Sequence, residues 1–166
     1  MNIQEKTIKK ICNFYINEWH LVTAILPYVA KLLENGIKID AYCEKNIHKN
    51  VELLLSRINI KNKYKKQILN INFGKENKNI NINLNLNNLL SENNKVSIIV
   101  SGSENYIEKV NDEIIRKIES GVCKICEINI INCYKISDNQ DSIKGILEKY
   151  DKLLRTSGEI DIQDVF

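Results

Sequence analysis

The stretch ICNFYINEWHLVTAILPYVAKLLENGIKIDAYCE, residues 11–44, joins two short apolar runs by one long helical pattern. The run 10–15 is rich in apolar and aromatic residues, which favours a buried strand. A helix is predicted next, with apolar residues three and four positions apart at Trp19, Val22, Ile25, Leu26, Val29, Leu32 and Leu33. It stops at Asn35-Gly36, and the alternating residues 37–44 predict another strand. The stretch therefore predicts a strand, a helix and a strand in succession.

The same alternation continues along the chain. Further strands are predicted at 67–73, at 95–103 where the strand runs into a loop, at 123–134 and at 159–162, and a second helix around Val51, Leu54, Leu55 and Ile58. Ser103 can cap a helix that bears Ile107 and Ile114 on its apolar face, and residues 142–156 carry the stripe of another helix. Residues 76–94 fit either an edge strand or a short helix. The order indicates an α/β fold, a three-layer sandwich whose mostly parallel sheet has helices on both faces.

Length and composition indicate one domain that spans residues 1–166. The chain is 43% hydrophobic, which is enough for a core of its own. Its 24 basic and 21 acidic residues are mixed, so neither the net charge of +3 nor the basic run 61–66 predicts nucleic-acid binding. The first residues lack the pattern of a signal peptide, and the longest apolar run is too short to span a bilayer. We therefore expect a cytoplasmic protein that binds neither nucleic acid nor membrane.

Two of the five cysteines form a C-x-x-C motif, Cys123 and Cys126, for which metal binding, redox exchange and packing are the three interpretations. Residues an odd number of positions apart in a strand point to opposite faces, so these thiols would not chelate one ion together. A zinc site needs about four ligands, and His20 and His48 are isolated in the sequence. A thioredoxin-like pair begins a helix after a strand, whereas this motif enters a strand. We predict structural thiols, and neither a metal nor a cofactor.

The loop after the first strand lacks the chemistry of a phosphate-binding loop. Its residues 16–20, INEWH, contain no glycine to curl around phosphates and no lysine to bind them. The chain also has no G-x-S-x-G motif of a serine hydrolase. ATP hydrolysis is therefore not expected, and no catalytic residue is predicted.

Three loops are predicted to meet in one crevice, because the carboxyl ends of parallel strands lie at the same edge of a sheet. The loop 100–104, VSGSE, offers hydroxyls and backbone N–H groups at a helix start, although plain helix capping is the first interpretation of Ser103. The loops 15–20 and 43–46 would share this crevice. The predicted ligand-binding residues are Tyr15, Trp19, His20, Glu44, Ser101, Gly102, Ser103 and Glu104. Trp19 has the alternative role of packing within its helix.

Residues 11–44 are similar to the opening of the MEDS (methanogen/methylotroph DcmR sensory) domain family. The shared features are a strand that ends in a tyrosine, a Pro-aromatic step, here Pro27-Tyr28, and a Leu-x-x-Gly turn that ends at Gly36. Residues 95–111 resemble the family's strand before a Gly-Glu-type turn. Residues 131–160 resemble its Cys-Tyr strand, amphipathic helix and terminal strand. The resemblance implies an α/β domain of the RecA or KaiC type with a degenerate phosphate loop, and a sensory role in signal transduction or transcription regulation.

The chain departs from the family at Tyr150-Asp151, where members often carry His-Pro, and at residues 76–94, which have no clear counterpart. The leading hypothesis is a non-enzymatic sensory domain that binds a small ligand and relays its state to a protein partner, such as a regulator or a kinase. The alternative is a protein-interaction adaptor, a homodimer without a ligand, that uses an exposed apolar face on 142–156 or on 80–86. The third hypothesis is an enzyme, either a degenerate nucleotide hydrolase or a thiol oxidoreductase.

Overall fold

One sheet organises the part of the chain that the computed structural model describes, residues 7–75, 88–90, 93–121, 127–139 and 141–164. Its six strands are β1 (Thr7–Tyr15), β2 (Lys38–Cys43), β3 (Lys95–Gly102), β4 (Glu127–Lys135), β5 (Lys152–Arg155) and β6 (Gly158–Asp161). They lie in the order β2-β3-β4-β1-β5-β6. All neighbouring pairs are parallel except β5 and β6, which form an antiparallel hairpin. The first strand of the chain is therefore interior to the sheet.

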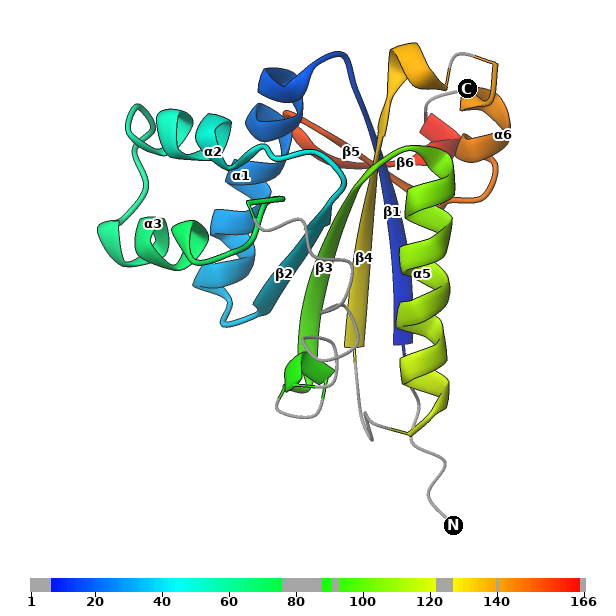
Figure 1. The fold of residues 1–166 in the computed structure, drawn as a ribbon, viewed down its shortest axis with the longest axis horizontal. Coiled ribbons are helices and arrows are strands. Elements are labelled where there is room, and N and C mark those ends of the chain that lie inside the picture. The colour runs from blue at the N-terminus through cyan, green and yellow to red at the C-terminus, as the bar shows by residue number, and fades with distance from the viewer. Residues whose placement is uncertain (1–6, 76–87, 91–92, 122–126, 140, 165–166) are drawn as a thin grey trace.

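Helices cover both faces of this sheet (Figure 1). On one face, here called the α1 face, lie α1 (Glu18–Glu34), α2 (His48–Leu55) and α3 (Asn62–Leu69), and on the other, the α5 face, lie α5 (Glu104–Glu119) and α6 (Ile143–Leu147). Short 3-10 turns, Ile136–Asp138 and Ile162–Asp164, follow β4 and β6. The structure confirms the predicted fold class, an α/β three-layer sandwich with a mostly parallel sheet.

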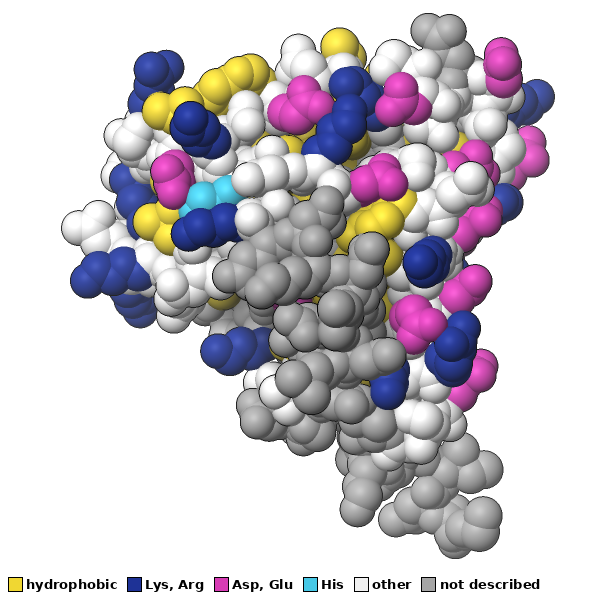
Figure 2. Space-filling model, viewed as in Figure 1, with side chains coloured by type: hydrophobic (Ala, Val, Ile, Leu, Met, Phe, Trp, Pro, Cys, Tyr) yellow, Lys and Arg dark blue, Asp and Glu magenta, His cyan; other side chains and the backbone are white. Residues whose placement is uncertain are grey.

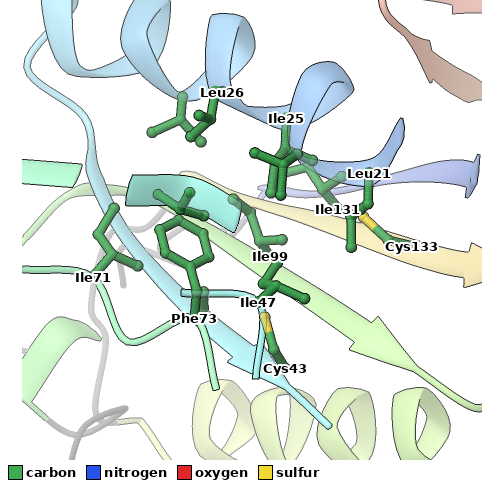
Figure 3. Packing of buried hydrophobic residues seen from close by; sticks show 14 of the residues in the cluster. Leu21, Ile25, Leu26, Cys43, Ile47, Ile71, Phe73, Ile99, Ile131 and Cys133 are labelled. Carbon is green, nitrogen blue, oxygen red and sulfur yellow. The ribbon is translucent and has the colours of Figure 1, made fainter. Parts of the chain in front are cut away.

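Strands β3 and β4 are buried on both faces, which explains why apolar residues predominate along them on both faces. On the α1 face, Ile99 and Ile131 pack against Leu21, Ile25 and Leu26 of α1 (Figure 3). On the α5 face, the same strands present Val96, Ile98, Val100, Ile128 and Ile130 to the apolar stripe Ile107, Val110, Ile114 and Ile118. The alternation of side chains along each strand thus supplies both cores at once.

Helix α1 has a polar cap at its start and a glycine just after its end. Asn17 caps its start, because the Asn17 side chain accepts a hydrogen bond of 2.9 Å from the backbone N–H of His20. Its end passes through Gly36, which has φ 74°, a left-handed conformation that glycine adopts without the steric cost of a side chain. The helix is continuous through Pro27. The predicted stop at Asn35-Gly36 is confirmed.

The prediction of a strand at 67–73 is wrong. Helix α3 continues to Leu69, and the following residues form a loop in which Ile71 and Phe73 turn their side chains into the core on the α1 face (Figure 3). This loop is tied to the start of α2 by the N–H of Ile47, which donates to the carbonyl oxygen of Phe73 at 2.9 Å. A short apolar run has no period that distinguishes a strand from a helix end with a buried loop.

The predicted helix at 142–156 is also wrong, because only its first part is helical. After α6, Tyr150 lies in a turn where its hydroxyl accepts a hydrogen bond from Asn132 at 2.8 Å and shares another with Tyr134 at 2.6 Å. Leu153 and Leu154 then belong to β5 and enter the cores on opposite faces of the sheet. The sequence spacing of these two leucines fits the apolar stripe of a helix. In the strand, however, their side chains point to opposite faces of the sheet. The predicted strand at 159–162 largely matches β6.

Charged side chains of both signs alternate over the outer surface of α5 (Figure 2). This mixture agrees with the interleaved basic and acidic residues of the sequence. Among the described residues, no helix combines the length and the apolar character needed to cross a membrane.

Replacement of Phe73 by alanine should lower the free energy of unfolding by about 3–5 kcal/mol, the usual cost of emptying a buried aromatic site. Phe73 is fully buried, at 0% exposure, although it lies in a loop. Leu53→Ala in α2 is the control, since Leu53 is exposed and its loss should cost less than about 0.5 kcal/mol. Urea unfolding of the two variants measures both values. A cost below about 1 kcal/mol for Phe73→Ala would contradict the burial of this loop.

Candidate functional site

The carboxyl ends of β1, β2, β3 and β4 meet at one edge of the sheet, here called the carboxyl crevice. A small cavity at this edge is lined by Tyr15, Glu18, Glu44, Lys45, Ile47, Ser101, Gly102, Ser103 and Asp138. Five of the eight predicted ligand-binding residues are therefore brought together at the carboxyl ends of three strands. The cavity measures about 20 Å³, which is enough for about one water molecule. In this structure the crevice is closed by the side chains of the protein.

Glu44 is one of the side chains that line the cavity. Its carboxylate lies at the N-terminus of α5, where Oε1 accepts from the backbone N–H of Ser103 at 2.9 Å and Oε2 from the Ser103 hydroxyl at 3.4 Å. The same hydroxyl accepts from the backbone N–H of Tyr106 at 3.2 Å, so Ser103 is also the predicted helix cap. A negative charge is favourable at the positive end of the helix dipole. Glu44 thus occupies the position where an external anion would bind.

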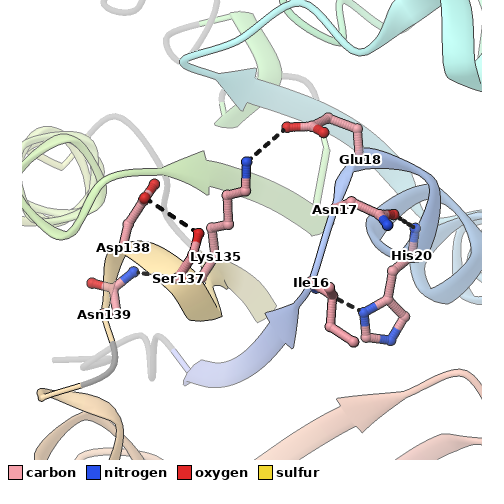
Figure 4. Close-up of polar contacts among 8 residues, drawn as sticks. All are labelled: Ile16, Asn17, Glu18, His20, Lys135, Ser137, Asp138 and Asn139. Carbon is pink, nitrogen blue, oxygen red and sulfur yellow. Dashed lines mark hydrogen bonds and ion pairs between the residues drawn. The ribbon is translucent and has the colours of Figure 1, made fainter.

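Three predicted site residues lie outside this cavity. Trp19 is 46% exposed at the start of α1 and faces solvent instead of a ligand or the core. The ring of His20 folds back on its own loop, where Nδ1 accepts a hydrogen bond from the N–H of Ile16 at 2.9 Å (Figure 4). Glu104 begins α5 and lines a separate cavity of about 300 Å³ between α5 and α6.

The sequence analysis missed the residues that the loop after β4 adds to the crevice. Lys135 forms an ion pair of 3.5 Å with Glu18 at the start of α1, and Asp138 lines the cavity beside it (Figure 4). A backbone hydrogen bond and the charge of Lys135 lower the pKa of Glu18, against the opposing effect of partial burial. The sequence did indicate these residues, because the polar segment KISD, 135–138, lies at the carboxyl end of a predicted strand of the same sheet.

Three cysteines, Cys12, Cys43 and Cys133, are buried and have free thiols. Burial raises the pKa of Cys12 and of Cys43 to about 12, and it raises the pKa of Cys133 well above its ordinary value. These thiols are protonated at neutral pH and are therefore poor nucleophiles. Cys123 and Cys126 lie outside the described residues, so the interpretation of the C-x-x-C motif stays a prediction. Within the described ranges, no three His, Cys, Asp or Glu side chains are grouped to hold a metal ion.

A larger cavity lies on the α1 face between α1 and the β5–β6 hairpin, and we call it the hairpin groove. Its volume is about 600 Å³, and its lining is Lys9, Ala24, Pro27, Tyr28, Lys31, Leu32, Asn35, Asn129, Leu154, Arg155, Thr156, Ser157, Gly158 and Glu159. The groove exists because α1 packs toward β2, α2 and α3 and leaves the neighbouring hairpin uncovered on this face. The sequence analysis missed it because the residues of one wall were assigned to a helix at 142–156.

A hydrogen-bonded carboxylate fixes one side of the hairpin groove. Glu159 of β6 accepts from the hydroxyl of Tyr28 at 2.7 Å and from the ammonium of Lys9 at 3.1 Å. Partial burial would raise the pKa of Glu159, but the hydrogen bonds from Tyr28 and Lys9 outweigh it and hold the pKa below its ordinary value. The carboxylate is therefore ionised at neutral pH and links β1, β6 and α1.

Comparison of the chain with protein-family models, with curated proteins and with solved structures finds no match. The resemblance of the sequence to the MEDS family therefore stays a prediction.

Gly102→Ala should destabilise the protein by about 1–3 kcal/mol, because the crevice has no room for an added methyl group. A Cβ at this position would lie 2.8 Å from Cβ of Glu44 and 2.8 Å from Cδ1 of Tyr106. Gly145→Ala is the matched control, since nothing lies within 4 Å of its added Cβ in α6 and alanine there should stabilise by about 0.5–1 kcal/mol. Urea unfolding distinguishes the two. Equal effects of the two substitutions would show that the crevice is not packed as described.

Proposed function

We propose that this chain is a non-enzymatic sensory domain of the cytoplasm that binds a small ligand in the hairpin groove and relays its state to a partner regulator. The observation that carries the proposal is the size of the groove. Its volume of about 600 Å³ lies within the range of small-molecule sites, about 300–1,000 Å³. The carboxyl crevice, at about 20 Å³, is too small for such a ligand. The resemblance to MEDS domains implies the same sensory class.

The lining of the groove has the mixed character that ligand sites require. Pro27, which is exposed on α1, supplies apolar surface, and the partly exposed Tyr28 adds an aromatic ring with its hydroxyl already bonded. Charged and amide side chains surround this apolar part. A ligand would gain from burying its apolar surface, while polar groups at the rim set its orientation.

Helix α1 is suited to relay the bound state. Its second half forms a wall of the groove, and its first turn carries Trp19, which is 46% exposed and follows Ile16, 64% exposed, in the preceding loop. Exposed aromatic and apolar side chains of this kind are frequent in protein interfaces. A ligand that presses on α1 therefore acts on the same rigid element that presents Trp19 to a partner.

The second candidate is an adaptor that binds a protein partner without a small ligand, and the exposure of Ile16 and Trp19 favours it. The surface first expected for such an adaptor is not available on 142–156, because Ile146, Leu147 and Leu154 of this segment are buried. Its other expected surface, 80–86, lies outside the described residues. Replacement of Trp19 by alanine would weaken partner binding under either candidate, so ligand binding is the property that separates them.

A thermal-shift screen with nucleotides, small hydrocarbons and common metabolites tests the proposal. A ligand present at 100 times its Kd stabilises the folded state by about 2.7 kcal/mol, which should raise the Tm by roughly 5–10 °C in a chain of this size. Pro27→Trp should abolish the shift, because Pro27 is exposed on the groove wall and a tryptophan there fills the groove without harming the helix. Thr23→Trp, on an exposed position of α1 outside the groove lining, should retain it.

A shift that persists in Pro27→Trp and disappears in Glu44→Ala would move the ligand to the carboxyl crevice. A wild-type protein that no compound class stabilises would favour the adaptor.

A further inference from the structure

We infer that the hairpin groove selects an amphipathic organic anion, a molecule with one carboxylate-like group on an apolar body. This inference rests on the proposed function and adds the chemical class of the ligand. The groove has unpaired positive charges with apolar surface beside them.

The charge of the groove is positive. Its lining contains three cations, Lys9, Lys31 and Arg155, and one carboxylate, Glu159. Lys9 and Glu159 neutralise each other through an ion pair of 3.1 Å. The ammonium of Lys31 and the guanidinium of Arg155 form no ion pair with any of the described residues. Two residues of the lining, one on α1 and one at the end of β5, therefore carry positive charges without a partner.

Glu159 is not free to pair with these two cations. One of its oxygens accepts from Tyr28 and the other from Lys9, so both are engaged. Its pKa lies below the ordinary value, so it also does not release its bonds by protonation near neutral pH. The role of the carboxylate is to hold Tyr28 and Lys9 in place. An anion that enters the groove meets Lys31 and Arg155 without having to displace an internal carboxylate.

The apolar part of the lining explains why the anion should be amphipathic. Pro27 is exposed and Tyr28 is partly exposed, so these two residues of α1 give the groove apolar surface that a ligand can cover. The planar guanidinium of Arg155 can bind a carboxylate through two parallel hydrogen bonds. A small inorganic anion would satisfy the charges and leave the apolar surface wet, whereas a ligand with an apolar body uses both.

Two fluorescent probes that differ mainly in charge provide the test. The first, 8-anilinonaphthalene-1-sulfonate, is an amphipathic anion, and the second, N-phenyl-1-naphthylamine, has the same aromatic body without the sulfonate. The wild-type protein should bind the anion with one saturable site. The double variant Lys31→Gln/Arg155→Gln should weaken binding of the anion by about tenfold or more and change binding of the neutral probe less than about twofold. Added salt should weaken only the anion.

The matched control is Lys38→Gln/Lys49→Gln, which removes two exposed positive charges outside the groove and should leave both affinities unchanged. Circular dichroism and the Tm of each variant establish that its fold is intact, because the anionic probe also binds loosened cores. Pro27→Trp should abolish binding of both probes. Thr23→Trp should leave the binding of both probes unchanged.

The outcomes separate the ligand class from the site. If Pro27→Trp blocks both probes but the Lys31 and Arg155 substitutions do not affect the anion selectively, the anionic class is wrong and the groove remains a ligand site. If the wild type binds neither probe, or if Pro27→Trp leaves binding unchanged, the groove is not the site and the proposed function fails with it.

Discussion

The parallel pairing of β1 with β4 is the interaction on which the rest of the structure depends. All nine residues of β1 are in register with β4, from Thr7 opposite Glu127 to Tyr15 opposite Lys135. On its other side β1 pairs with β5 through Ile11 and Cys12. The second half of this strand is buried, at Ile11, Cys12 and Tyr15, and these side chains enter the cores on both faces of the sheet. The sheet order also decides which surfaces the helices leave open.

Two consequences follow from this central strand, and they explain the two candidate sites. The strands that lie on the β4 side of β1 end together with it, which gathers polar loops at the carboxyl crevice. There the polar groups of the protein pair with one another. Glu44 accepts a hydrogen bond at the start of α5, and Glu18 forms an ion pair with Lys135. On the β5 side, the hairpin extends beyond the area that α1 covers. The groove that results contains cations without partners, and a ligand binds more readily where the protein has left such groups unsatisfied.

Much of this arrangement could be predicted from the sequence, because local patterns determine it. Ser103 before an apolar helical stripe, the stop at Gly36, and polar loops after buried strands indicated the helix start, the helix end and the meeting of Tyr15, Glu44 and Ser101 at one edge. The volume of the crevice could not be predicted, since it depends on how side chains from several separate loops pack together. The groove could not be predicted either, because it depends on a contact between residues far apart in the sequence. Residues 152–155 pair with β1 as a strand, whereas the sequence pattern predicted a continuing helix there.

The measurement that tests the groove most directly is amide hydrogen exchange of the full chain with and without 8-anilinonaphthalene-1-sulfonate. A ligand held between α1 and the hairpin should slow exchange in the second half of α1 and in β5 and β6, residues 24–35 and 152–161, because bound contacts suppress local opening there. Slower exchange at residues 16–20, 44–47 and 101–104, with none in the hairpin, would contradict the account and place the ligand in the carboxyl crevice.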